Sequence, residues 1–155
     1  MADAIPAEFE EDFMHRTSSK SHVFPYTFEI LDYLQNKYQL HIITNGFDES
    51  QAKKINSAKL TTYFDLVVTS ETTGYKKPDA RIFHHTVEKL GTRHEHCLMI
   101  GDNPNSDILG AINAGIDQVY FNPEGKQIDL KPTYTISYLK KFPLFTSDTS
   151  ASSSA

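Results

Sequence analysis

Two acidic residues, Asp102 and Asp107, follow the apolar run 97–100 at a point where a strand pattern gives way to a helix pattern. Ligands of an α/β sheet bind at the carboxyl ends of its strands, so both carboxylates are expected at a ligand-binding edge. Carboxylates there cost desolvation energy unless a cation compensates them, and a hard divalent ion is the usual partner. We therefore predict that Asp102 binds Mg²⁺, and that Asp107 is either a second ligand or orients a ligating water.

Residues upstream complete a set that suits phosphate chemistry. Thr44, Asn45 and Gly46 close a short apolar strand, and the hydroxyl and the backbone N–H groups of this turn can donate to phosphate oxygens. Lys77 follows a second strand and can neutralise phosphate charge. Phosphoryl transfer depends mostly on positioning and charge stabilisation, which these groups supply. The sequence thus predicts a phosphate-binding set made of these four residues, with Thr44 and Lys77 in catalytic roles.

Each of these motifs also has a purely structural explanation. The Thr-Asn-Gly segment is a strand end and turn, and Lys77 before a proline is a solvated lysine ahead of a helix. The two acids can be a turn residue and a first-turn charge that the helix dipole favours. Only their combination, in this order and with each motif at a strand end, indicates function.

Alternating helix and strand patterns must position these residues. The expected strands are 40–44, 64–69, 96–100, 118–121 and a short edge strand 134–136. The expected helices are one with Pro25 in its first turn, 48–58, one capped by Asp79 that stops at Gly91, 107–114 ended by Gly115, and one after the last strand. Strands separated by helices indicate βαβ units and a parallel sheet, and continuous apolar runs are typical of strands buried on both faces. The predicted fold class is therefore doubly wound α/β.

Length, net charge and cysteine content indicate which partners and which cellular compartment to expect. A length of 155 residues suits one domain, and 15 basic against 20 acidic residues give a net charge of −5, so no nucleic-acid partner is expected. No stretch is long and apolar enough for a membrane, and the first residues lack the pattern of a signal peptide. The single cysteine, Cys97, is expected to be a buried thiol in a reducing compartment, so we expect a cytoplasmic protein. Residues 7–16 read as a short helix, 17–21 as a polar hinge and 146–155 as a disordered tail.

With their surroundings, these motifs resemble the haloacid dehalogenase-like hydrolase superfamily over residues 23–140. Thr44 in Ile-Ile-Thr-Asn-Gly matches its second motif, Lys77 in Gly-Tyr-Lys-Lys-Pro-Asp its third, and Asp102 and Asp107 in Gly-Asp-Asn-Pro-Asn-Ser-Asp its fourth. The tetrapeptide Thr-Asn-Gly-Phe is most similar to the corresponding segment in a subgroup of pyrimidine 5′-nucleotidases. The resemblance implies a Rossmann-like core with helices on both faces, Mg²⁺ as cofactor, and hydrolysis of a small phosphorylated metabolite, such as a pyrimidine nucleotide, through an aspartyl-phosphate.

The sequence departs from the superfamily at its first motif, Asp-x-Asp-x-Thr, which carries the nucleophile on the central strand. No Asp-x-Asp occurs in the chain. From the resemblance we then expect residues 1–22 to be a remnant of the helical cap and hinge. We expect residues 23–145 to form an incomplete core that lacks the first, central strand. That strand would lie between the strands that end at Thr44 and Asp102, which would leave both with unpaired backbone groups.

We therefore expect a C-terminal portion of a larger hydrolase, inactive alone because its nucleophile is missing. The alternative is a non-catalytic phosphate- or metal-binding module, either a pseudoenzyme or half of a split enzyme whose partner is the missing N-terminal half. A response-regulator receiver, another parallel α/β domain with acid, Thr and Lys, is disfavoured because its acids would come first.

Two other patterns suggest metal binding only superficially. The segment 102–107 is similar to a calcium loop, but it has Pro104 in place of an oxygen ligand and lacks the turn glycine. The clusters His84-His85 and His94-Glu95-His96 are not expected to bind metal, because adjacent helical residues point in different directions and the second cluster lies in a polar connection.

Overall fold

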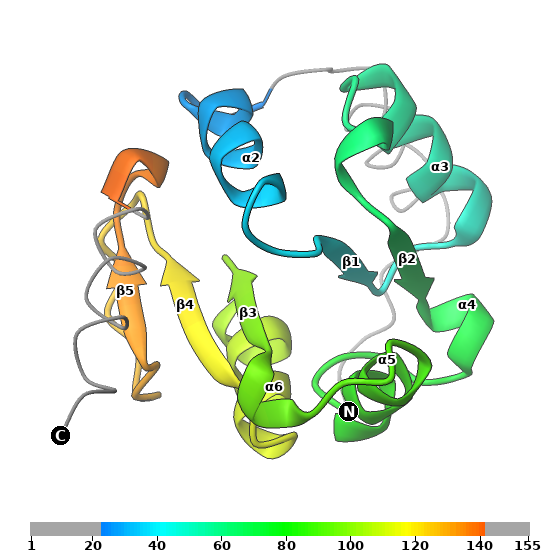
Figure 1. The fold of residues 1–155 in the computed structure, drawn as a ribbon. Helices are drawn as coiled ribbons and strands as arrows, with labels where there is room; N and C mark the ends of the chain where they lie inside the picture. The colour runs from blue at the N-terminus through cyan, green and yellow to red at the C-terminus, as the bar shows by residue number, and fades with distance from the viewer. Residues whose placement is uncertain (1–22, 142–155) are drawn as a thin grey trace, which may run out of the picture.

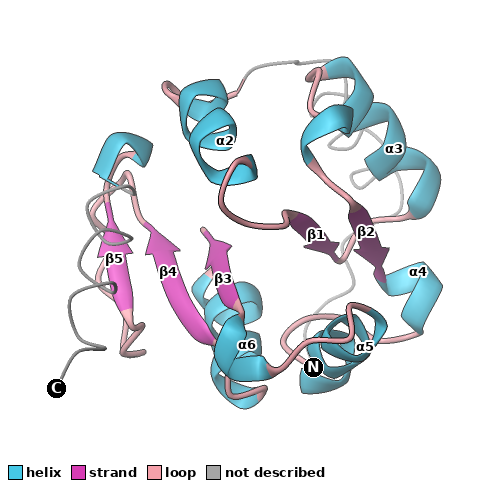
Figure 2. Ribbon diagram, viewed as in Figure 1, coloured by secondary structure: helices cyan, strands magenta, loops and turns pink. Residues whose placement is uncertain are grey.

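Strands and helices alternate along residues 23–141, the part of the chain that the computed structural model describes (Figures 1 and 2). The strands are β1 (His41–Thr44), β2 (Leu66–Thr69), β3 (Leu98–Gly101), β4 (Asp117–Phe121) and β5 (Tyr134–Ile136). The α-helices are α2 (Thr27–Gln35), α3 (Asp48–Ser57), α4 (Ser70–Thr73), α5 (Ala80–Lys89) and α6 (Leu109–Asn113). Short helical turns are η1 (Thr61–Tyr63), η2 (His94–His96), η3 (Pro104–Ile108) and η4 (Leu139–Lys141). The expected helix 7–16 and tail 146–155 lie outside the described residues.

The strands form two parallel sheets rather than one. Strand β1 pairs with β2, and β3, β4 and β5 pair in that order. The parallel α/β prediction is confirmed. Among residues 23–141, no strand lies between β1 and β3, which face each other across the gap between the two sheets (Figures 1 and 2). We call this gap between β1 and β3 the division. The division falls where the resemblance places the missing central strand.

Two hydrophobic clusters join the sheets in place of backbone hydrogen bonds. The first connects β2 to α5 and α6, and its buried members are Val68, Ile82, Phe83, Val87, Ala111, Ala114 and Ile116. The second packs α2 against β4 and β5 through Ile30, Leu34, Val119, Phe121 and Ile136. Because α2 precedes β1 in the chain, this second cluster ties the β1–β2 half to the other sheet. Apolar burial across the division therefore holds the fold together.

Several helix boundaries agree with the sequence, and others do not. Asp79 caps α5 by accepting from the Arg81 N–H, and Gly91 and Gly115 follow their helices with φ of 63° and 72°, as expected for helix ends. Pro25 lies outside α2, because Tyr26 adopts a left-handed conformation (φ 68°) just before the helix begins. The chain after β5 forms only the short turn η4 before the described residues end.

The helix predicted at 107–114 begins earlier, as a π-helical turn at Pro104 that continues into α6. The side-chain oxygen of Asn103 accepts from the backbone N–H groups of Asn105 and Ser106, which starts the turn four residues before its first buried apolar residue, Ile108. The apolar pattern alone could not show this start.

Strand β3 corrects the expectation that every strand is buried on both faces. Leu98 and Ile100 are 42% and 40% exposed, because β3 has a neighbour on only one side within residues 23–141. Cys97, just before β3, is half-buried rather than buried, and burial raises the pKa of its thiol. No helix in this part of the chain combines the length and apolarity needed to cross a membrane.

The stability of the fold should depend on pH through His41, the first residue of β1. Its Nδ1 atom is buried without a hydrogen-bond partner in the described structure, and burial lowers the pKa of His41 from 6.5, while Asp65 partly offsets this. The unfolded chain then binds the proton more readily, so the contribution of His41 is complete above about pH 6.5 and is lost as pH falls towards the folded pKa. We expect His41→Gln to flatten the dependence of the unfolding free energy on pH between 8 and 5. Parallel curves for the two proteins, measured by urea denaturation, would contradict this.

Candidate phosphate and metal site

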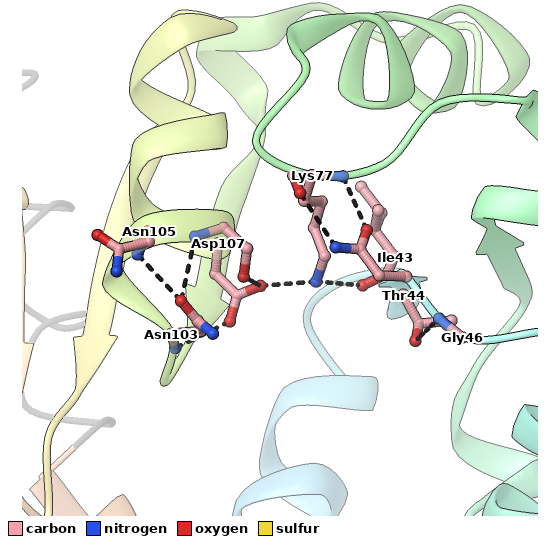
Figure 3. A network of polar contacts seen from close by, with 9 residues as sticks. Ile43, Thr44, Gly46, Lys77, Asn103, Asn105 and Asp107 are labelled. Atoms are coloured by element: carbon pink, nitrogen blue, oxygen red, sulfur yellow. Dashed lines mark hydrogen bonds and ion pairs between the residues drawn. The ribbon is translucent and has the colours of Figure 1, made fainter. Parts of the chain in front are cut away.

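The ammonium group of Lys77 lies at the centre of a polar network at the carboxyl end of β1 (Figure 3). Its Nζ donates to Asp107 Oδ1 at 2.6 Å and to the Ile43 carbonyl at 2.9 Å. The side chains of Lys77 and Asp107 are only 10% and 8% exposed. Since Lys77 precedes α5 and Asp107 lies in η3, this ion pair joins the β1 half of the molecule to the β3 half.

Asn45 fixes the backbone of Lys77. Its Oδ1 accepts from the Lys77 N–H at 2.7 Å, and its Nδ2 donates to the Lys77 carbonyl at 3.0 Å. The Ser70 hydroxyl donates to the Asn45 carbonyl at 2.9 Å, which holds the turn after β1 against the start of α4. The peptide bond between Lys77 and Pro78 is cis. Both polar atoms of the Asn45 side chain are therefore used to hold the backbone of Lys77.

Thr44, the last residue of β1, keeps its hydroxyl proton available within the described part of the chain. Thr44 Oγ1 accepts from the Gly46 N–H at 3.1 Å (Figure 3). A hydroxyl that accepts one hydrogen bond can still donate its own proton. Thr44 can therefore donate to an anion beside the Lys77 ammonium, while the Gly46 N–H is already bonded within the turn.

The carboxylate of Asp107 is held on several sides. Besides Lys77, its Oδ1 lies 3.3 Å from the Ser106 hydroxyl, and its Oδ2 accepts from the Asn103 N–H at 3.1 Å. These donors stabilise a buried negative charge and fix its position. Direct metal ligation by Asp107 would have to share this carboxylate with Lys77.

The Asp102 carboxylate makes no hydrogen bond or ion pair to the residues of this network. Asp102 is exposed, and in the described part of the chain its carboxylate has no hydrogen bond or ion pair; it lines a cavity of about 90 Å³ at the end of β4. Glu124, and more weakly Asp102, raise the pKa of Lys126, which lines the same cavity. Residues 23–141 contain no group of three or more His, Cys, Asp or Glu side chains that could hold a metal.

The structure thus brings together five of the six residues expected from the sequence, namely Thr44, Asn45, Gly46, Lys77 and Asp107. Sequence reasoning missed the supporting groups of Ile43, Ser70, Asn103 and Ser106. Of these, the polar run from Asn103 to Ser106 is a visible signal, whereas a backbone carbonyl such as that of Ile43 leaves none.

Gly101, the last residue of β3, makes room for Asp107. A Cβ atom at this position would lie 2.7 Å from Asp107 Cγ. We expect Gly101→Ala to push Asp107 away from Lys77 and to lower the unfolding free energy by about 1–3 kcal/mol, the usual cost of overpacking. Asp102→Ala, which truncates the exposed neighbour, is the control and should change stability by less than about 0.5 kcal/mol. Equal unfolding free energies for the two variants in urea would contradict this.

Comparison with known proteins identifies the family and supports the fold. Residues 2–121 match a family model described as haloacid dehalogenase-like hydrolase. Pyrimidine 5′-nucleotidase YjjG from Escherichia coli is 35% identical over 141 residues, covering 86% of this chain and 61% of that protein. Glyceraldehyde 3-phosphate phosphatase from Methanothermobacter thermautotrophicus is 39% identical over 102 residues, covering 65% of this chain and 45% of that protein.

Among solved structures, the magnesium-bound HAD-hydrolase YfnB from Bacillus subtilis has a TM-score of 0.82 at 30% identity, covering 91% of this chain and 62% of that chain. The chain spans less than two thirds of the length of each of these relatives.

Proposed function

Because the chain belongs to the haloacid dehalogenase-like hydrolase family, we propose that it supplies the phosphate- and metal-binding part of a Mg²⁺-dependent phosphate monoester phosphatase. The observation that carries this proposal is the buried Lys77 ammonium between the Asp107 carboxylate and the turn after β1. A cation held in place at the carboxyl edge of parallel strands is suited to bind a phosphoryl group.

Each side chain of the network has a defined role in the proposed reaction. Lys77 uses two of its three N–H bonds on Asp107 and Ile43 within the described structure, which leaves the third for a phosphoryl oxygen. The Thr44 hydroxyl donates to the same group. Asn45 and Gly46 shape the turn and hold these donors in place, so that they lose little entropy when phosphate binds.

We propose that Mg²⁺ binds near Asp102, with Asp107 as a second ligand or as the acceptor for a ligating water. Mg²⁺ is commonly held by one or two carboxylates together with waters and substrate phosphate, so the donors present fit this ion. Bound there, Mg²⁺ would neutralise charge on the phosphoryl oxygens. The exposed Asp102 is free to approach it, whereas Asp107 positions Lys77.

The proposed substrate is a small phosphorylated metabolite, and a pyrimidine nucleotide is the first to test. Two similar proteins are named pyrimidine 5′-nucleotidases, from Escherichia coli and Streptococcus pneumoniae. Others are named for sugar and triose phosphates, which supports the broader class of phosphate monoesters.

We further propose that hydrolysis passes through an aspartyl-phosphate on a residue that this sequence does not contain. No Asp-x-Asp occurs in the chain, and the edges of β1 and β3 lack a shared neighbour in the described structure. Both observations support a C-terminal part that needs an N-terminal strand carrying the nucleophile. They equally support the second candidate, a non-catalytic binding module or half of a split enzyme.

The proposal is tested by separating binding from turnover. We expect inorganic phosphate with Mg²⁺ to shift the amide NMR signals of Thr44, Gly46 and Lys77, and Lys77→Ala to abolish these shifts while Lys76→Ala retains them. We expect no Mg²⁺-dependent hydrolysis of uridine 5′-monophosphate or p-nitrophenyl phosphate by the 155-residue chain alone. Unchanged amide signals would contradict the phosphate site, and appreciable turnover would contradict the missing nucleophile.

The intact mass of the protein in its source cells separates the two candidates. A mass well above 17.6 kDa supports a longer hydrolase that carries its own nucleophile. A mass equal to 17.6 kDa supports the binding module or the split enzyme, and co-purification of a second polypeptide with an Asp-x-Asp strand then favours the split enzyme.

A further inference from the structure

Two histidines from different sequence clusters lie next to each other, and neither has a hydrogen bond within the polar network around Lys77. His84 belongs to α5 and His94 begins η2, ten residues later. His84 Nδ1 lies 2.8 Å from His94 Nε2, and the ring centroids are 4.9 Å apart. The sequence presents these residues in separate clusters, whereas the fold pairs one member of each.

We propose that His84 and His94 form a binding site for a borderline transition-metal ion, with Zn²⁺ as the first candidate. Imidazole nitrogen is a preferred ligand of Zn²⁺, Cu²⁺ and Ni²⁺ and a poor one for Mg²⁺. Two neutral imidazoles can both face the ion if each carries its proton on the ring nitrogen that points away. This proposal does not depend on the proposed phosphatase function.

The geometry needs little change to accept the ion. Zn–N bonds of about 2.0–2.1 Å at a tetrahedral angle put two ligand nitrogens about 3.4 Å apart. The facing nitrogens at 2.8 Å would therefore separate by roughly half an ångström, which small rotations of exposed side chains allow. Water would complete the coordination, because no third His, Cys, Asp or Glu joins the pair among residues 23–141.

Charges around the pair do not oppose a cation. Both arginines within residues 23–141 are engaged: Arg81 pairs with Asp79 at 2.7 Å, and Arg93 pairs with Glu95. The positive charge of a protonated His84 is among the smaller influences that lower the pKa of Asp79, after the hydrogen bonds from Arg81, so this carboxylate lies within electrostatic reach of the pair.

Bound metal would link two segments that flank the phosphate site. Helix α5 begins three residues after Lys77, and η2 ends two residues before β3, which leads to Asp102. A metal between His84 and His94 would cross-link this α5–β3 connection, which turns at Gly91. Since an ion that binds only the folded state stabilises it, Zn²⁺ should raise the thermal stability of the chain.

The test is a calorimetric titration of the full 155-residue chain with ZnCl₂, beside the variants His84→Gln and His94→Gln. The adjacent histidines supply matched controls, His85→Gln and His96→Gln. We expect one Zn²⁺ per chain, a Kd weakened about tenfold or more in each pair variant, and the wild-type Kd in both controls. Millimolar Mg²⁺ should not compete.

Thermal unfolding gives a second readout and checks folding. Without metal, all four variants should melt close to wild type, because none of these histidines is buried. With Zn²⁺, the melting temperature should rise for wild type and controls but not for the pair variants. Zinc binding that survives both pair substitutions, or that is lost equally in the controls, overturns the proposal.

Discussion

Replacing Lys77 with methionine should lower the free energy of unfolding by about 3–5 kcal/mol, the cost of breaking a buried ion pair. Among the described residues, the Asp107 carboxylate, 8% exposed, would keep only the Asn103 N–H and Ser106 hydroxyl as partners and would lose its counter-charge. The Ile43 carbonyl would lose its bond from Nζ as well. Urea denaturation measures the loss directly.

Two further variants show whether the ion pair causes this loss. Lys76→Met alters the exposed neighbouring lysine and should change stability by less than about 0.5 kcal/mol. The double variant Lys77→Met/Asp107→Leu replaces both charges with apolar groups and should recover most of the lost stability, because no unpaired charge stays buried. A Lys77 variant as stable as the Lys76 variant would show that the ion pair does not support the fold.

Replacing Phe83 with alanine should also cost about 3–5 kcal/mol, as large truncations in a core do. Phe83 is 1% exposed and belongs to the cluster that joins β2, α5 and α6. Its ring also lies against Gly110 of α6, where a Cβ atom would come within 2.6 Å of Phe83 Cε2 and 3.1 Å of Pro78 Cα. The substitution would therefore leave a cavity between the helices that follow Lys77 and Asp107. Chemical denaturation of the purified variant gives the value.

Phe47→Ala is the matched control for this prediction. Phe47 is 56% exposed, so its truncation should change the unfolding free energy by less than about 0.5 kcal/mol. Similar losses for the two phenylalanines would show that the cluster around Phe83 does not hold α5 and α6 together.

The sequence predicted the order of strands and helices because their apolar periodicities differ and because capping residues mark the ends. Asp79 begins a helix, and Gly91 and Gly115 follow the ends of helices, as expected. The start at Pro104 was missed because the Asn103 side chain, rather than apolar spacing, begins that turn. The exposure of Leu98 and Ile100 was missed because an apolar run shows what a strand could bury, and not whether a neighbour is present.

The candidate site was predicted as a set of residues but not as a set of contacts. Thr44, Lys77 and Asp107 were expected at one edge because parallel strands end there together. Which carboxylate meets Lys77 depends on how η3 turns back over β3, and local spacing does not encode this. The pairing of His84 with His94 likewise depends on how α5 and η2 pack, so a reading confined to neighbouring residues could not find it.

The division between β1 and β3 also sets how the backbone should exchange hydrogen with solvent. Strand β4 bonds to neighbours on both sides, and Val119 and Tyr120 at its centre are almost fully buried. Strands β1 and β3 bond on one side only within residues 23–141, so alternate amides in each point away from any ladder partner. Protection against exchange should therefore be greatest in β4 and lower in the strands that bond on one side only. The strands that carry Thr44 and lead to Asp102 are therefore expected to exchange faster than β4.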